Sequence, residues 1–192
     1  NELDEEGNIW TCYRLYPTID PIRFGPLTPM DEPKGGYLDD AIIKISPKDG
    51  SVLFKKSVTE ILIDNNMKHL LDTGGYTRDP IHLNDIQPVL SDSEYWKKGD
   101  LFLSLREQSM VILYRPDDNL VLWRSEGYLG QQHDVDVISD GKISIFNNNA
   151  YHNYKNQMIV DGTNNIVIYD FEKDNYSYYL DESMKKNEIK TK

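Results

Sequence analysis

Residues 99–124 read GDLFLSLREQSMVILYRPDDNLVLWR and contain three short apolar segments that are separated by polar turns. The segments 101–105, 110–114 and 120–123 are rich in β-branched, aromatic and other apolar side chains, and their short length favours strands over helices. The turn Pro116-Asp-Asp-Asn119 has the composition of a hairpin connection. The stretch therefore predicts three successive antiparallel strands.

The same pattern continues through the rest of the chain. Further short apolar segments occupy residues 9–13, 41–45, 52–54, 142–146 and 166–169, with Gly- or Asn-containing turns between them. Short strands joined by tight turns predict an all-β fold. One short helix is expected as well, because Ser57-Val-Thr-Glu60 has the form of a capping box and is followed by apolar residues.

Three glycines align these segments with one another, and each glycine directly precedes a predicted strand: Gly7, Gly99 and Gly141. Each strand is followed by a predicted hairpin, at residues 42–54, 111–123 and 158–169. Aligned on their turns, the hairpins place one aromatic residue each at the same position: Phe54, Trp123 and Tyr169. Three copies of a four-stranded unit predict a partial β-propeller.

The expected blades occupy residues 1–57 (with a loop insertion at 15–38), 82–126 and 133–180. Residues 58–81 are expected to form the helical insertion, and residues 181–192 a linker or the start of another blade. Because three blades cannot close a ring, we expect a single incomplete propeller domain that needs the remaining blades of a parent chain.

The composition excludes several classes of function. The chain has 21 Lys and Arg against 32 Asp and Glu, a net charge of −11, which argues against nucleic acid as a partner. The single cysteine, Cys12, excludes an internal disulfide and a Cys-rich zinc site. No apolar run approaches the roughly 18 residues of a membrane-spanning helix, so no membrane-spanning segment is expected.

Two histidines open predicted first strands, in His82-Leu-Asn-Asp-Ile86 and His133-Asp-Val-Asp-Val137. First strands line the channel of a propeller, so both histidines are predicted to point into it. Two arginines and two asparagines complete the predicted substrate-binding set: Arg14, Asn84, Arg106 and Asn148. Such a set suits a small oxyanion, because Arg offers a planar fork of donors and His a titratable one. The sequence leaves open whether the histidines and arginines share one end of the channel.

Structural roles explain some of the same residue types. A repeated His-to-Asp spacing also ties strands to turns inside a blade, and Asp85 and Asp136 are interpreted as turn or strand-tying residues rather than as acids in a mechanism. His69 and His152 are predicted to be solvated. A zinc site built from the two channel histidines and a carboxylate has weak support from the spacing, so no metal is expected.

The runs that carry the chemistry resemble the arylsulfotransferase family: Arg78-Asp-Pro-Ile-His-Leu-Asn-Asp-Ile86, Gly99-Asp-Leu-Phe-Leu-Ser-Leu-Arg106, Gln132-His-Asp-Val-Asp136 and Asp140-Gly-Lys-Ile-Ser-Ile-Phe-Asn-Asn148. The resemblance implies a six-bladed propeller that transfers a sulfuryl group from an aryl sulfate to a phenolic acceptor. It implies that no nucleotide or other cofactor takes part. It also implies an extracytoplasmic location, periplasmic or secreted.

The resemblance further implies a ping-pong reaction in which a histidine carries the sulfuryl group between donor and acceptor. His82 and His133 match channel histidines of the family, and are thereby the catalytic residues expected here, as oxyanion binders or proton donors. The sulfated histidine of the family falls in a later blade, beyond Lys192. The chain departs from the family at Asn147, where an Asp is usual, and after it, where His152 and Lys155 stand in place of an arginine.

Two other functions stay open on the sequence. One is a non-catalytic propeller that serves as a scaffold or ligand-binding module, since one fold supports many functions. The other is a propeller hydrolase or lyase that acts on a different anionic substrate. The identity of the donor and of the acceptor stays open too, and so does a homo-oligomeric state.

Overall fold

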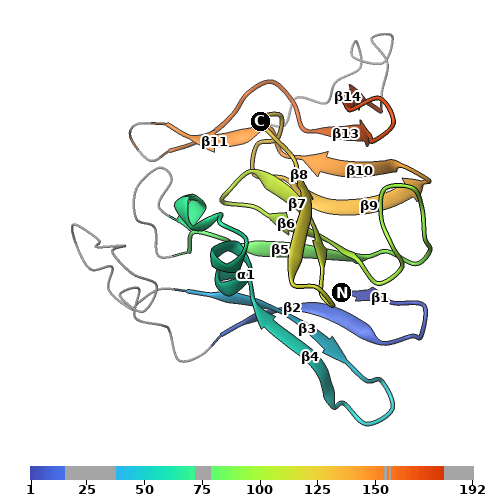
Figure 1. Ribbon diagram of the computed structural model, residues 1–192. Helices are drawn as coiled ribbons and strands as arrows, with labels where there is room; N and C mark the ends of the chain where they lie inside the picture. The colour runs from blue at the N-terminus through green and yellow to red at the C-terminus, as the bar shows by residue number, and fades with distance from the viewer. Residues whose placement is uncertain (16–37, 72–78, 154, 156, 180–192) are drawn as a thin grey trace.

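The computed structural model describes residues 1–15, 38–71, 79–153, 155 and 157–179. In these residues the chain forms three four-stranded antiparallel sheets, a two-stranded hairpin, one α-helix and one short 3-10 helix. Figure 1 shows the first sheet, in blue and cyan, below the second, in green and yellow, and the third, in orange and red, at the top. The predicted all-β fold is confirmed, and the packed four-stranded sheets are consistent with part of a propeller.

Each sheet keeps its strands in chain order. The first sheet contains β1 (Glu2–Leu3), β2 (Ile9–Arg14), β3 (Asp40–Ile45) and β4 (Val52–Ser57). The second contains β5 (Leu83–Pro88), β6 (Leu101–Leu105), β7 (Met110–Arg115) and β8 (Leu120–Arg124). The third contains β9 (His133–Ser139), β10 (Lys142–Asn147), β13 (Asn165–Asp170) and β14 (Asn175–Tyr178). The separate hairpin of β11 (Ala150–His152) and β12 (Met158–Val160) is inserted between β10 and β13.

The three aligned glycines all adopt positive φ just before the second strand of a sheet. Their φ values are +79° at Gly7, +90° at Gly99 and +69° at Gly141. This left-handed conformation is accessible to glycine without steric cost, which explains the residue type at each turn. At Gly141 space is limiting too, because an added Cβ would lie 2.6 Å from the ring of Tyr95.

One predicted hairpin is wrong. The sequence pairs residue 158 onward with residues up to 169, but β12 pairs with β11, and β13 turns into β14. Tyr169 therefore lies on a third strand, whereas Phe54 and Trp123 lie on fourth strands. The Tyr169 ring instead packs against Trp123 of the preceding sheet, with centroids 4.7 Å apart. Trp123 and Tyr169 thus fill the space between the second and third sheets by packing against each other, not by occupying equivalent positions in the two sheets.

The three sheets pack against one another through two apolar cores, one between each pair of neighbouring sheets. Between the first and second sheets, Trp10 and Ile42 pack against Leu103 and Ile112. Between the second and third, Phe102 and Leu113 pack against residues of β9, β10 and β13, including Ile143, Ile145 and Tyr169. The second sheet thus has both faces buried, and this agrees with the near-continuous apolar sequence of β6 and β7.

The helical insertion belongs to the first of these cores. Helix α1 (Val58–Asp64) begins after Ser57, whose side chain accepts the Glu60 N–H at 3.0 Å, as the sequence predicts. A 3-10 helix, η2 (Lys68–Leu71), follows. Ile61 and Leu62 are fully buried against the sheets, so the insertion fills the core rather than decorating the rim. Of the loop insertion expected at 15–38, residues 16–37 lie outside the described residues.

Two carboxylates tie neighbouring sheets together. Asp40 Oδ2 at the start of β3 accepts the Leu83 N–H at 2.8 Å, and Asp85 Oδ2 on β5 accepts the Val135 N–H at 2.8 Å. Burial raises the pKa of each carboxyl to about 6, against the opposing effect of the hydrogen bond. The interpretation of Asp85 as a strand-tying residue is confirmed. The same interpretation of Asp136, which is exposed on β9, stays a prediction.

No helix in the described part of the chain is long and apolar enough to cross a membrane.

Candidate functional site

The histidines and arginines singled out in the sequence lie at one edge of the sheets. Because β5 and β6 are antiparallel, His82, just before β5, lies beside Arg106, just after β6. The backbone N–H of Arg106 donates to the backbone carbonyl of His82 at 3.1 Å. In the third sheet, His133 begins β9 and Asn148 follows β10 at the same edge. We call this the histidine edge; it comprises Arg14, Asp79, His82, Arg106, Gln131, His133, Asn148 and His152.

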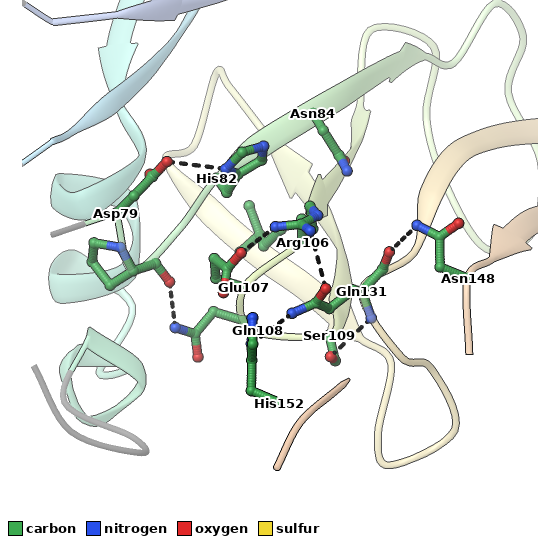
Figure 2. A network of polar contacts seen from close by, with 12 residues as sticks. Asp79, His82, Asn84, Arg106, Glu107, Gln108, Ser109, Gln131, Asn148 and His152 are labelled. Carbon is green, nitrogen blue, oxygen red and sulfur yellow. Dashed lines mark hydrogen bonds and ion pairs between the residues drawn. The ribbon is translucent and has the colours of Figure 1, made fainter. Parts of the chain in front are cut away.

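Asp79 joins the first two sheets at this edge. Its Oδ2 lies 3.0 Å from His82 Nδ1 and 3.1 Å from Arg14 Nη2. Burial opposes ionisation of Asp79, but the His82 hydrogen bond and the Arg14 charge outweigh it and lower the pKa of the carboxyl. A carboxylate only accepts hydrogen bonds, so His82 carries its hydrogen on Nδ1 and presents Nε2 away from Asp79. Figure 2 shows this contact beside the Arg106 network.

Arg14 is held by two carboxylates. Besides Asp79, its Nε contacts Asp40 Oδ1 at 2.7 Å, and its side chain is 27% exposed. These charges raise the pKa of the Arg14 guanidinium although burial opposes the shift. Arg14 therefore orients Asp79, and through it His82.

Arg106 lies between the second and third sheets. Its Nη1 pairs with Glu107, and its Nη2 donates to Gln131 Oε1 at 3.0 Å. The guanidinium carries five N–H donors, so these contacts leave donor capacity for a ligand. Its side chain is 19% exposed, which keeps the charge accessible at the edge.

The pKa of His133 is lowered in the folded chain. Burial is the main cause that lowers the pKa of its imidazole, and the charges of Arg106 and His82 lower it further. His133 is therefore predominantly neutral at pH 7. The strand registers place His133 of the third sheet at the same edge as His82 and Arg106 of the second, and the lowered pKa of His133 agrees with that placement.

The side-chain amides of the two predicted asparagines donate to backbone carbonyls, and the Asn84 contact joins the second sheet to the segment before β9. Asn84 Nδ2 donates to the Gln132 carbonyl at 2.9 Å, and Asn148 Nδ2 donates to the Gln131 carbonyl at 2.6 Å. Asn84 Oδ1 is buried and has no hydrogen-bond partner among the residues that the structure describes. Both side chains thus support the edge structurally, and their predicted contact with substrate stays a prediction.

The shared His-x-x-Asp motif does not give the structural correspondence of the two histidines. Ser104 and Phe146 occupy equivalent positions, because each follows its aligned glycine by the same number of residues. Ser104 pairs with Asp85, whereas Phe146 pairs with His133, so the strand register places His133 opposite the equivalent of Asp85 and not of His82. The residue of the third sheet that resembles His82 in conformation is Gln131. Irregularities in β5 and β9 shift the register and explain why sequence spacing misaligns the two first strands.

His82 and Gln131 share two backbone features. Their φ values are +50° and +48°, uncommon for residues other than glycine. The carbonyl of His82 accepts from the backbone of Arg106, and that of Gln131 accepts from the side chain of Asn148. Arg106 and Asn148 are both seven residues after an aligned glycine.

Three residues of the site were not identified from the sequence as functional. Asp79 and Gln131 have no motif of their own, and only their proximity to the histidines in sequence could have indicated them. His152, predicted to be solvated, is exposed but lies with Nδ1 3.2 Å from Gln131 Nε2. The β11–β12 hairpin, which the sequence misassigned, brings it there.

The positive charge of the predicted oxyanion-binding set is partly neutralised. Two arginines meet three carboxylates at this edge, Asp40, Asp79 and Glu107. The arrangement therefore offers directional donors and titratable imidazoles rather than a strong positive field. Within the described residues, no group of three or more His, Cys, Asp or Glu side chains is arranged to hold a metal ion.

A groove of about 380 Å³ lies at the other end of β5 and β9. Its lining includes Gln87, Ser91, Trp96 and Ser139. The histidine edge, at the start of the same strands, does not coincide with it. The assignment of the site rests on the convergence of the titratable side chains.

Comparison with known protein families gives one match. No curated protein matches the chain. One family model, described as arylsulfotransferase (ASST), matches residues 1–192. The match covers all three sheets and every residue of the histidine edge, and the chain therefore belongs to the arylsulfotransferase family.

Proposed function

We propose that the histidine edge forms part of a site that transfers a sulfuryl group from an aryl sulfate to a phenolic acceptor. The family membership supports the reaction class. The observation that carries the proposal is the convergence of His82, Arg106 and His133 at one edge of two sheets, where the charges of Arg106 and His82 help to lower the pKa of His133. Donors of this kind stabilise the charge that develops on sulfuryl and leaving-group oxygens.

The proposed reaction has two displacement steps. A histidine nitrogen attacks the sulfur of the aryl sulfate; an N–S bond forms, the S–O bond to the aryl group breaks, and the leaving phenolate takes a proton. The oxygen of the acceptor phenol then attacks the same sulfur, the N–S bond breaks, and the acceptor releases its proton. We place the attacking histidine in a later blade of a longer parent chain, which the resemblance implies.

His82 fits the role of the group that moves the proton. With Nδ1–H bound to Asp79, protonated His82 donates from Nε2 to the leaving phenolate and then holds a lone pair there. The same lone pair accepts the proton of the incoming phenol, so the proton balance closes over one cycle. Arg14 contributes by orienting Asp79.

Arg106 and neutral His133 fit the role of oxyanion binders. Arg106 offers unused N–H donors, and the lowered pKa of His133 lets it act as a neutral donor without a change of charge. An extracytoplasmic location and completion of the ring by further blades are parts of the same proposal, on the resemblance alone.

The test is release of 4-nitrophenol from 4-nitrophenyl sulfate with a second phenol as acceptor. It compares this chain with the longest parent chain that contains later blades. The parent is expected to show ping-pong kinetics, and His82→Asn or His133→Asn is expected to lower kcat/KM by about 100-fold or more. The variant His69→Asn, in the helical insertion, is the control. A folded parent that releases no nitrophenol contradicts the proposed reaction.

A non-catalytic binding module is the second candidate, and one observation favours it. Glu107 and Asp79 already pair with the two arginines, which reduces the positive charge available to stabilise a transition state but leaves N–H donors for a ligand. Titration of the chain with 4-nitrophenyl sulfate, followed by the imidazole NMR signals, separates the candidates. Binding without turnover in the parent supports the module; turnover supports the transferase.

A further inference from the structure

Gln131 lies at the centre of the polar network in Figure 2. Its Oε1 accepts from Arg106 Nη2 at 3.0 Å, and its Nε2 lies 3.2 Å from His152 Nδ1. Its backbone N–H donates to Ser109 Oγ at 3.1 Å, and its carbonyl accepts from Asn148 Nδ2 at 2.6 Å. One residue thus connects an arginine of the second sheet with a histidine of the inserted hairpin.

The chemistry of Arg106 determines the orientation of the Gln131 amide. A guanidinium donates hydrogen bonds and cannot accept them, so the amide oxygen must face Arg106 and the amide nitrogen must face His152. The amide nitrogen is also only a donor, so His152 Nδ1 must be the acceptor. A neutral imidazole that accepts at Nδ1 carries its hydrogen on Nε2.

The backbone at Gln131 shows that the side chain, not the turn, explains this residue type. Its φ of +48° is a conformation that glycine adopts without steric cost. A buried glutamine, 5% exposed, occupies the position instead, and its polar atoms are satisfied by the contacts above. Unfavourable backbone conformations of this kind cluster at functional sites.

His152 is placed to use the tautomer that Gln131 selects. It ends β11 and is exposed, so its Nε2–H is open to a ligand while Nδ1 is held. Arg106, at the other end of the Gln131 amide, presents its remaining N–H donors at the same edge. The two donors are coupled, because one amide group fixes both.

We propose that Gln131 is a positioning residue that holds His152 as the Nε2–H tautomer and joins it to Arg106 as a pair of donors for an oxyanion. The identity of that oxyanion, a sulfuryl group, rests on the proposed function; the tautomer does not. Gln131 is not expected to touch the reacting atoms.

The first test is the tautomer of His152 in the full chain, measured by imidazole ¹⁵N–¹H correlation NMR. The sequence has only 4 histidines, so the spectrum is simple, and His152→Asn assigns the signals by their loss. The expected result is a protonated Nε2 and an unprotonated Nδ1. A wild-type chain in which His152 carries its hydrogen on Nδ1 overturns the proposal, and this result needs no Gln131 variant to fold.

The variant Gln131→Glu is the second test. A carboxylate still accepts from Arg106 but also accepts from His152, so Nδ1 is expected to become protonated. Gln108→Glu is the matched control, because the Gln108 amide donates to the Pro80 carbonyl at 2.6 Å and, in the described part of the chain, makes no hydrogen bond to His152. An unchanged His152 Nδ1 in a folded Gln131→Glu chain overturns the proposal.

The third test measures the affinity for 4-nitrophenyl sulfate. Gln131→Leu is expected to weaken binding by about 10- to 100-fold, and Gln108→Leu to leave it unchanged. If a parent chain that contains later blades shows the expected His152 tautomer but binds no aryl sulfate, the proposed function fails and the positioning role is still supported. If the tautomer is wrong, the positioning role fails whatever the chain binds.

Discussion

The carboxylate of Asp85 on β5 accepts a 2.8 Å hydrogen bond from the backbone N–H of Val135 on β9, so that one side chain joins the first strands of two sheets. Burial disfavours the ionised form of Asp85, and it therefore raises the pKa of this carboxyl to about 6 although the hydrogen bond opposes the shift. An ionised carboxylate in this position is less stable than one in water.

Asp85→Asn is expected to remove a pH dependence from folding. Since the pKa of Asp85 is higher in the folded chain than the usual value of about 3.9, the folded state binds more protons between about pH 4 and 6. The free energy of unfolding of the wild type, relative to that of Asp85→Asn, therefore falls as the pH rises through this window. The expected fall is about 1–2 kcal/mol, because Asp85 is partly exposed to solvent. Urea unfolding at pH 4 and pH 7 measures it. Asp117→Asn, in an exposed turn, is the control, and parallel pH profiles for wild type and Asp85→Asn would contradict the expectation.

Asp79→Asn is expected to show the opposite sign. The pKa of Asp79 is lowered in the folded chain because the His82 hydrogen bond and the Arg14 charge outweigh burial. Its stabilisation is therefore complete above about pH 4 and is lost as the pH falls through the lower folded-state pKa. At pH 7 the variant is expected to be less stable by about 1–3 kcal/mol. A variant as stable as the wild type at pH 7 would show that Asp79 does not hold this edge together.

Arg106→Leu is expected to raise the pKa of His133. Burial, the main cause of the lowered pKa, remains in this variant, but the nearby positive charge is removed. The pKa is measured by NMR titration of the imidazole C–H signals. Arg124→Leu removes a charge that pairs with Glu126 at the end of β8, and it is expected to leave His133 unchanged. Equal shifts in both variants would rule out a specific effect of Arg106.

Gly141→Ala is expected to destabilise the chain more than Gly99→Ala. Both positions have positive φ, which costs alanine about 1–2 kcal/mol. At Gly99 an added Cβ meets nothing within 4 Å, whereas at Gly141 it lies 2.6 Å from the Tyr95 ring, which adds about 1 kcal/mol or more. Urea unfolding of the two variants gives the difference. In the background Tyr95→Ala the excess cost at Gly141 is expected to disappear; if it persists, the ring is not its cause.

The strand pattern of this chain was predictable because most of it is local. The apolar segments around 101–105 and 110–114 became β6 and β7, and the Ser57 cap became the start of α1. The failure at residues 158–169 has a physical cause. An extra hairpin, β11–β12, occupies the connection between β10 and β13, and a strand-like segment does not reveal which neighbour it pairs with.

The site was predictable in part. His82, Arg106 and His133 were identified from their residue types and positions, but the sequence left open whether they share one edge, because that depends on the register between paired strands. The contacts of Gln131 depend on a left-handed backbone and on a hairpin that returns to the edge. Neither leaves a pattern in the sequence, so this residue required the structure.

The two inter-sheet ties run in the same direction along the chain. Asp40 precedes its donor Leu83 by 43 residues, and Asp85 precedes Val135 by 50. During synthesis on the ribosome each acceptor therefore emerges before the strand that binds it. The first and second sheets each contain the carboxylate that binds the following strand before that strand is made, so this part of the molecule is suited to assembly in the order of translation.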